Sequence, residues 1–174
     1  DFSDADTADL VKAGYSKGVP MGGDLKAAPE GKAPVFLIAA MKDPDGANLD
    51  RAQVIKGWLG ADGKTQEKIY EVKWSGERTP GADGKLPAVG NTVDLKTATY
   101  TNSIGAATLS AYWKDPAFDA SQRAFYYVRV IQIPSPRWTA YDQKRYGVKM
   151  PDSVPMTVTD RAYTSPIWYT PSMK

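Results

Sequence analysis

The sequence predicts a mainly β protein. The expected fold is an antiparallel β-sandwich of immunoglobulin-like or jelly-roll-like form, with short helical segments near the N-terminus and around residues 138–146. Five or six runs are rich in β-branched and aromatic residues, and turn signals separate them at spacings that suit antiparallel pairing. Few stretches have helical composition. A single curled sheet packed on those helical segments is the alternative.

The size and charge of the chain indicate one ordinary globular unit. Its 174 residues suit a single β-rich domain with a substantial core. The net charge of +2 argues against nucleic-acid binding, and no apolar run approaches the roughly 20 residues that cross a bilayer. Because the chain begins with Asp1 rather than Met, we expect a piece of a longer protein. The compartment stays open, with the periplasm or cell envelope as the working hypothesis.

The sequence contains no Cys and no His. Disulfides, thiolate metal sites, a histidine general base, a Ser-His-Asp triad and a histidine-ligated zinc site are therefore excluded within these 174 residues. Carboxylate chemistry and oxygen-ligated calcium sites remain open. We expect no cofactor in this chain.

The N-terminal segment predicts a helix and then a tight loop. Ser3 suits an N-cap, residues 7–17 have helical composition, and Gly18 would end the helix. In the following loop, Gly22 and Gly23 indicate either a plain turn or a close approach of the backbone to another segment. A phosphate-binding loop would need a preceding strand and a following Lys-Ser/Thr, and the sequence has neither.

Residues 35–41 form a continuous apolar run that suits a buried strand, closed by a turn at Asp43-Pro-Asp-Gly46. Four potential oxygen ligands lie within eight residues: Asp43, Asp45, Asn48 and Asp50. A calcium loop would place Gly at its sixth position and Glu at its twelfth, whereas here the Gly is fourth and that Glu is missing. We favour an acidic turn over a calcium site.

The next two runs predict a hairpin. Residues 51–59 and 66–74 alternate between apolar and polar positions, and Gly60-Ala-Asp-Gly-Lys64 lies between them. Trp74 shares one face of the second strand with Tyr70 and Val72. Residues 75–91 form a Gly/Pro-rich loop long enough to pack against another segment or to carry function, and residues 92–102 are ambiguous.

Residues 107–113 predict another strand, and residues 123–133 predict the central strand, because both of its faces are mostly apolar and so suggest cover on both sides. Arg129 lies in the middle of this strand among aromatic and aliphatic residues. A buried Arg requires a partner, so we expect an Asp, a Glu or an aromatic ring beside it, or an anionic ligand.

The C-terminal part predicts a stiff exit and a short helix. Pro134-Ser-Pro136 leaves the central strand, and residues 139–146 have room for two helical turns that place Trp138, Tyr141 and Arg145 on one side. Residues 162–170 form the last run, in which Pro166 favours a sheet edge or the start of a strand.

Six segments carry a family resemblance, and together they span nearly the whole chain. They are Asp50–Trp58, Glu71–Ser75, Val89–Val93, Tyr126–Val130, Pro136–Trp138 and Ser165–Pro171. With them the chain resembles the C-terminal region of a bacterial domain-of-unknown-function family, number 3604, whose members are similar to the PHP (polymerase and histidinol phosphatase) metallohydrolases.

The resemblance implies a catalytic parent, in which an N-terminal metal-binding barrel rich in His and carboxylates precedes a region like this one. Because this chain has no His, none of the family's metal ligands carries over to it. The resemblance therefore implies a non-catalytic C-terminal domain, a divalent metal held elsewhere in the parent, and the N-terminal catalytic domain as partner.

Three functions remain open. The chain is an accessory domain of a metal-dependent ester hydrolase, a module that binds carbohydrate or another ligand through aromatics such as Trp74, Trp138 and Tyr141, or a dimerisation or interaction domain. A row of aromatic residues on one exposed sheet face would favour the binding module. An apolar patch along one edge or helix would favour the other two functions.

Overall fold

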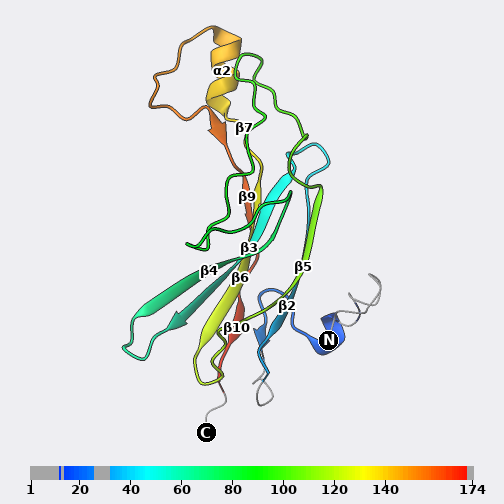
Figure 1. The fold of residues 1–174 in the computed structure, drawn as a ribbon, viewed down its shortest axis with the longest axis vertical. Coiled ribbons are helices and arrows are strands. Elements are labelled where there is room, and N and C mark those ends of the chain that lie inside the picture. The colour runs from blue at the N-terminus through cyan, green and yellow to red at the C-terminus, as the bar shows by residue number, and fades with distance from the viewer. Residues whose placement is uncertain (1–11, 13, 26–31, 172–174) are drawn as a thin grey trace.

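The computed structural model describes residues 12, 14–25 and 32–171. Its larger sheet has six strands: β1 (Asp24–Leu25), β3 (Leu49–Leu59), β4 (Thr65–Trp74), β6 (Ala124–Gln132), β9 (Arg161–Tyr163) and β10 (Ile167–Tyr169). The strand order is β1-β10-β6-β3-β4, and β9 also pairs with β6 (Figure 1). Among the strand pairs of the described residues in this sheet, only β1 and β10 are parallel. The predicted hairpin and the predicted central strand are both present.

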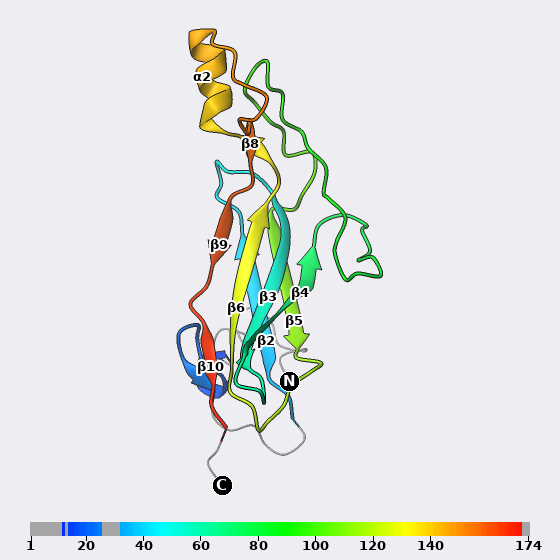
Figure 2. The ribbon, with the colours of Figure 1, turned by 90° about the vertical axis from the view of Figure 1, so that its left-hand side faces the viewer.

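A second, smaller sheet lies against one face of the larger one (Figure 2). It consists of β2 (Val35–Met41) and β5 (Thr108–Lys114), which pair in antiparallel fashion. Alternate residues of β2 are buried, so Phe36 and Ile38 point between the sheets while their neighbours face outward. The core between the two layers contains Phe36, Ile38, Leu49, Ala52, Val54, Leu109, Ala124, Tyr126 and Tyr169. This two-layer arrangement confirms the predicted mainly β, sandwich-like fold.

The two faces of β6 are not covered alike. On the inner face, toward β2 and β5, Ala124 and Tyr126 are buried. On the outer face, Phe125, Tyr127 and Arg129 are only half-buried. The expectation of full cover on both sides is therefore wrong for the outer face from Phe125 to Arg129, whereas Ile131, farther along the same face, is buried.

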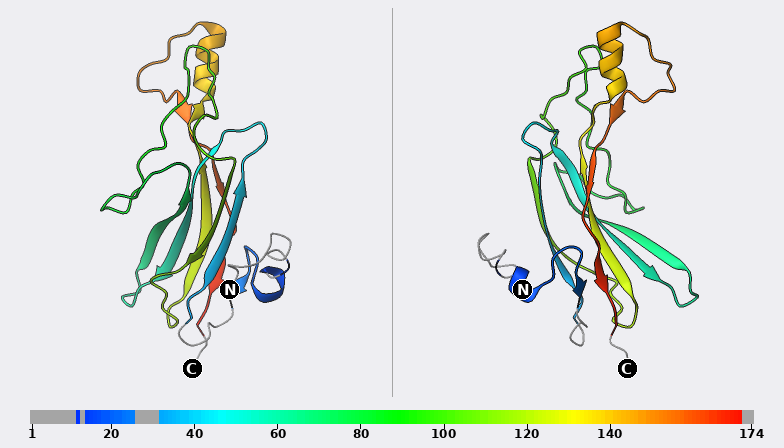
Figure 3. Two further views of the ribbon diagram at one scale, coloured as in Figure 1. Left: turned by 45° about the vertical axis from the view of Figure 1, so that its right-hand side comes forward. Right: turned by 180° about the vertical axis from the view of Figure 1, so that it is seen from behind.

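The predicted helix near residue 138 is present as α2 (Trp138–Tyr146), which Gly147 ends with a left-handed φ of 66°. Two short strands, β7 (Ser135–Pro136) and β8 (Thr157–Val158), pair at its base. We call residues 134–158 the helical tip, because α2 stands beyond the end of both sheets (Figure 3). Residues 12 and 14–17 are helical, and the rest of the predicted N-terminal helix lies outside the described residues.

The glycine loop before β1 packs against the last strand. Gly22 donates its backbone N–H to the carbonyl of Pro166, and the carbonyl of Gly23 accepts from the backbone of Trp168. The last predicted run is split into β9 and β10, with Pro166 between them. The close approach suggested by the two glycines therefore positions β10. Within the described residues, no helix has the length and apolar character needed to span a membrane.

Candidate binding surfaces

The helical tip exposes large aromatic side chains. Trp138 is 60% exposed and Tyr141 49% exposed, and Tyr146, which the sequence analysis did not single out, is 65% exposed. The guanidinium of Arg137 lies 5.1 Å from the Trp138 ring, and that of the exposed Arg145 lies 5.6 Å from the Tyr146 ring. The predicted residues Trp138, Tyr141 and Arg145 thus lie together on the surface of α2, and Trp138 is not a core residue.

Only two residues of α2 are buried, Thr139 and Ala140. The Thr139 hydroxyl donates to the carbonyl of Pro155 at 2.7 Å, which ties the helix to the loop that returns to β8. A nine-residue helix is marginal in water by itself. Lys144 also donates to the carbonyl of Thr97, and Gln143 accepts from the backbone of Met150, so the part of the helix open to another molecule is the side with the exposed rings.

Trp74 does not belong to the helical tip. Its indole N–H donates to the carbonyl of Arg78 at 2.7 Å, and the side chain is half-buried under the loop at residues 75–91. Arg78 attaches this loop to the sheet, because its guanidinium lies 2.6 Å from the carboxylate of Asp50 and also donates to the carbonyls of Ser75 and Pro87. Trp74 therefore has a structural partner and is half-buried, whereas Trp138 and Tyr141 are exposed.

The acidic run at residues 43–50 forms a turn, in which Asp43 accepts a hydrogen bond from the backbone of Asp45. The ammonium group of Lys42 donates to three carbonyls of this turn, those of Asp43, Pro44 and Gly46, at 2.8 to 3.1 Å. The backbone oxygens that could face a cation are thus turned toward a lysine. Among the described residues, no group of three or more acidic side chains is placed to hold a metal ion.

Arg129 lies on the outer face of the larger sheet, where its Nε donates to the side-chain oxygen of Gln53 at 2.8 Å. The amide of Gln53 in turn donates to Glu71 at 2.6 Å. The sequence predicted a carboxylate or an aromatic ring beside Arg129. The partner is instead Gln53, which is itself hydrogen-bonded to the carboxylate of Glu71. The second oxygen of Glu71 and Nε of Arg51 are buried without a hydrogen-bond partner.

A row of four aromatic side chains crosses the same outer face, and we call it the aromatic strip. It contains Trp168 of β10, Phe125 and Tyr127 of β6, and Tyr163 of β9. Successive ring centroids lie 5.3, 6.4 and 6.3 Å apart, and the rings of Phe125 and Tyr127 are parallel to within 10°. Trp168 is 47% and Tyr163 57% exposed. Sequence alternation places Phe125 and Tyr127 on one face, but only strand pairing adds the other two rings.

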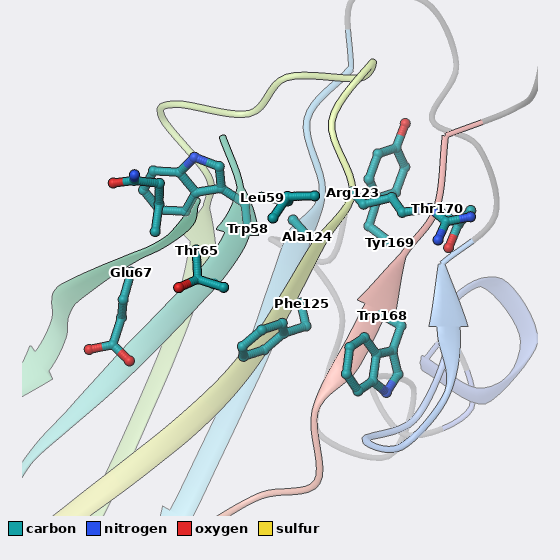
Figure 4. Close-up of a pocket in the computed structure, with 12 residues that line it drawn as sticks. Trp58, Leu59, Thr65, Glu67, Arg123, Ala124, Phe125, Trp168, Tyr169 and Thr170 are labelled. Carbon is teal, nitrogen blue, oxygen red and sulfur yellow. The ribbon is translucent and has the colours of Figure 1, made fainter. Parts of the chain in front are cut away.

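A concave pocket of about 500 Å³ lies at the Trp168 end of the aromatic strip (Figure 4). Figure 4 shows the Phe125 ring between Glu67 of β4 and the indole of Trp168. Polar residues that line the pocket are Thr65, Gln66, Glu67, Arg123 and Thr170. The site therefore combines the aromatic residues Trp58, Phe125, Trp168 and Tyr169 with polar groups that include one acidic and one basic side chain.

A buried ion pair lies on the inner side of the same sheet. Nζ of Lys56 lies 2.6 Å from Oδ2 of Asp115, and both side chains are almost fully buried. The Tyr126 hydroxyl donates to the same carboxylate oxygen at 2.8 Å, and Lys56 also donates to the carbonyl of Ala117. Burial, together with the hydrogen bond to Asp115 and its charge, holds the pKa of Tyr126 well above its ordinary value. Because this group is enclosed in the core, it serves the fold.

The comparisons with known proteins identify the family. The search of curated proteins gave no match, and neither did the search of solved structures. A family model described as "Protein of unknown function (DUF3604)" matches residues 1–171. Since this match covers almost the whole chain, the protein belongs to the DUF3604 family.

Proposed function

We propose that this chain is a non-catalytic accessory β domain of a PHP-like metal-dependent ester hydrolase, and that its helical tip docks against the catalytic domain of the parent protein. The observation that carries the proposal is the exposure of Trp138, Tyr141 and Tyr146 on a short helix at one end of the molecule. Aromatic residues and Arg are enriched at protein interfaces and among the residues that dominate their binding energy.

The composition of the tip suits such a contact. Arg137 and Arg145 lie against the exposed rings, so the patch offers both apolar area and planar hydrogen-bond donors. A catalytic domain rich in carboxylates, as the family resemblance implies, would provide complementary acceptors. In this proposal the divalent metal and the reacting groups belong to the catalytic domain, and the β domain shapes the substrate entrance.

The test is the Trp138→Ala substitution, measured in two proteins. In the isolated chain we expect the free energy of unfolding to change by less than about 1 kcal/mol, because most of the side chain is already exposed. In the full-length protein we expect turnover to fall by about tenfold or more, with weaker binding of the separately expressed catalytic domain. Tyr112→Ala, which removes a 44% exposed aromatic from the small sheet, is the matched control.

Two results would contradict the proposal. If the isolated chain loses several kcal/mol while full-length turnover is unchanged, Trp138 stabilises the domain itself. If Trp138→Ala instead converts a dimer of the isolated chain into a monomer, the tip is a dimerisation surface, which is the alternative function for the same patch.

A further inference from the structure

We propose that the outer face of the larger sheet binds a neutral saccharide chain, with one sugar ring seated in the pocket between Trp168 and Glu67 and the following rings stacked along the aromatic strip. This site is separate from the helical tip, which lies at the other end of the molecule (Figures 1 and 2). It also uses none of the aromatic residues named from the sequence for a binding module.

The floor of the pocket depends on Gly57. A β-carbon built at this position would lie 2.3 Å from the end of the Phe125 ring and 2.5 to 3.0 Å from the two adjacent ring carbons. Glycine therefore lets the Phe125 ring lie across the backbone of β3, where any other residue would push it away from the sheet. A ring that lies along a sheet offers its opposite face to a ligand.

The wall of the pocket comes from Trp168. Its indole lies 5.3 Å from the Phe125 ring and is tilted by 50° to it, so the two rings form an open angle rather than a stack. Trp168 is 47% exposed and is one of the residues that line the pocket. The volume of about 500 Å³ lies within the range of roughly 300 to 1,000 Å³ that is typical of small-molecule sites.

The lining favours a saccharide over other ligands. A pyranose ring has faces of C–H groups, which stack on aromatic rings, and a belt of hydroxyl groups, which need hydrogen-bond partners around the edge. Thr65, Gln66 and Glu67 are close together on β4 at one side of the pocket, and Arg123 lines it as well. Glu67 and Arg123 together give the charged part of the lining no net charge, which suits a neutral ligand whose hydroxyls can both donate and accept hydrogen bonds.

The continuation of the strip favours a chain over a single sugar. Beyond Phe125, the parallel ring of Tyr127 and then Tyr163 follow at steps of 6.4 and 6.3 Å. Arg129 and Gln53 lie beside this second half, since Tyr163 pairs with Arg129 and Arg129 with Gln53 across the strands. Gln53 is buried and both atoms of its amide are hydrogen-bonded, so the half-buried Arg129 is the polar group at this part of the strip. The aromatic rings therefore continue beyond the length of one sugar unit.

The experiment uses the 174-residue chain and a panel of soluble neutral polysaccharides: mixed-linkage β-glucan, xylan, galactomannan and soluble starch. Migration in native gels that contain each polysaccharide is measured first, and calorimetry with a matching oligosaccharide follows. We expect at least one polysaccharide to retard the chain, and Trp168→Ala to weaken binding by at least tenfold. Glu67→Gln is expected to weaken binding less, because the amide keeps one acceptor.

Tyr112→Ala is the control, because it removes an exposed aromatic side chain from the smaller sheet and should leave retardation unchanged. Unfolding curves of each variant show whether a loss of binding reflects a loss of folding. The proposal is overturned if no polysaccharide in the panel retards the chain, or if Trp168→Ala binds as tightly as the unchanged chain. It is equally overturned if Trp168→Ala abolishes self-association of the chain and no saccharide binds, because the strip would then be a protein interface.

Discussion

The inner and outer faces of the larger sheet are built by alternate residues of the same strands, yet their aromatic and charged side chains differ in burial. On the inner face, Tyr126 and Lys56 lie under the smaller sheet and are almost fully buried. On the outer face, Phe125, Tyr127 and Arg129 are half-buried, with exposed rings beside them. Both faces combine aromatic rings with a cationic side chain. The difference arises from the cover of β2 and β5 over the inner face. On the outer face Ile55 and Gln53 of β3 are buried, but the aromatic side chains around them keep contact with water.

This difference in burial determines which ion-pair or hydrogen-bond partners a charged side chain needs. Lys56, enclosed in the core, has a direct ion pair with Asp115, a backbone acceptor, and the Trp58 and Tyr126 rings 5.5 and 5.7 Å away. Arg129, which retains contact with water, has a neutral glutamine. A buried charge without a partner is costly, whereas a half-buried one still has water to complete its hydrogen bonds.

The largest effect is expected from breaking the inner pair. Asp115→Ala leaves the Lys56 ammonium and the Tyr126 hydroxyl buried without their shared acceptor. We expect a loss of about 3–5 kcal/mol in the free energy of unfolding, measured by urea denaturation. The control is Asp62→Ala, whose partner Lys64 is 79% exposed and whose loss should cost at most about 1 kcal/mol. A similar cost for both variants would show that burial does not distinguish the two pairs.

A smaller effect is expected from Gly57→Ala on the outer face. The added β-carbon must displace the Phe125 ring, and overpacking of this kind costs about 1–3 kcal/mol. The ring can turn toward water, so the cost should fall near the lower end, while the near-ultraviolet circular dichroism of the aromatic strip should change strongly. In a Phe125→Ala background the same substitution should cost much less. Additive costs would mean that the ring does not lie across Gly57 in solution.

The smallest effect is expected from Arg129→Met, which keeps much of the aliphatic stem and removes the hydrogen bond to Gln53. A typical hydrogen bond contributes about 0.5–1.5 kcal/mol, and water can replace the lost donor at this half-buried position. Thermal unfolding should therefore shift by a few degrees at most. A loss as large as that of Asp115→Ala would show that the outer face is as well sealed as the inner one, and it would count against an open binding face.

Most strands and the α2 helix could be predicted from local patterns. The runs at residues 35–41, 51–59 and 66–74 correspond to β2, β3 and β4, with boundaries within two residues. Alternation reports which residues share a face, and Pro and Gly report where an element ends. These signals come from neighbouring residues, so the sequence contains them directly. The helix begins at Trp138, with Arg137 between it and the stiff Pro134-Ser-Pro136 segment, and the Trp138 side chain is exposed.

The partners of the charged residues could not be predicted in the same way. Lys56 and Asp115 are 59 positions apart, and each looks like an ordinary polar residue at a strand or turn position. The sequence analysis instead singled out Arg129, because the two mostly apolar faces of its strand suggested cover that the outer face does not have. Which face is covered depends on where β2 and β5 pack, and that is a property of the assembled layers.

The sequence by itself determined the β-rich character, the positions of the long strands, the helical tip and the family. Alternation, turn residues and family-specific segments are patterns of residues close together in the sequence, so they can be recognised without the fold. Only the tertiary structure decided that Trp168 and Tyr163 join Phe125 and Tyr127 in one strip, since β9 and β10 reach β6 by pairing across 30 or more positions of sequence. The tertiary structure also decided which face of β6 is covered by the smaller sheet. Burial is a collective result of how the layers pack, and local composition cannot specify it.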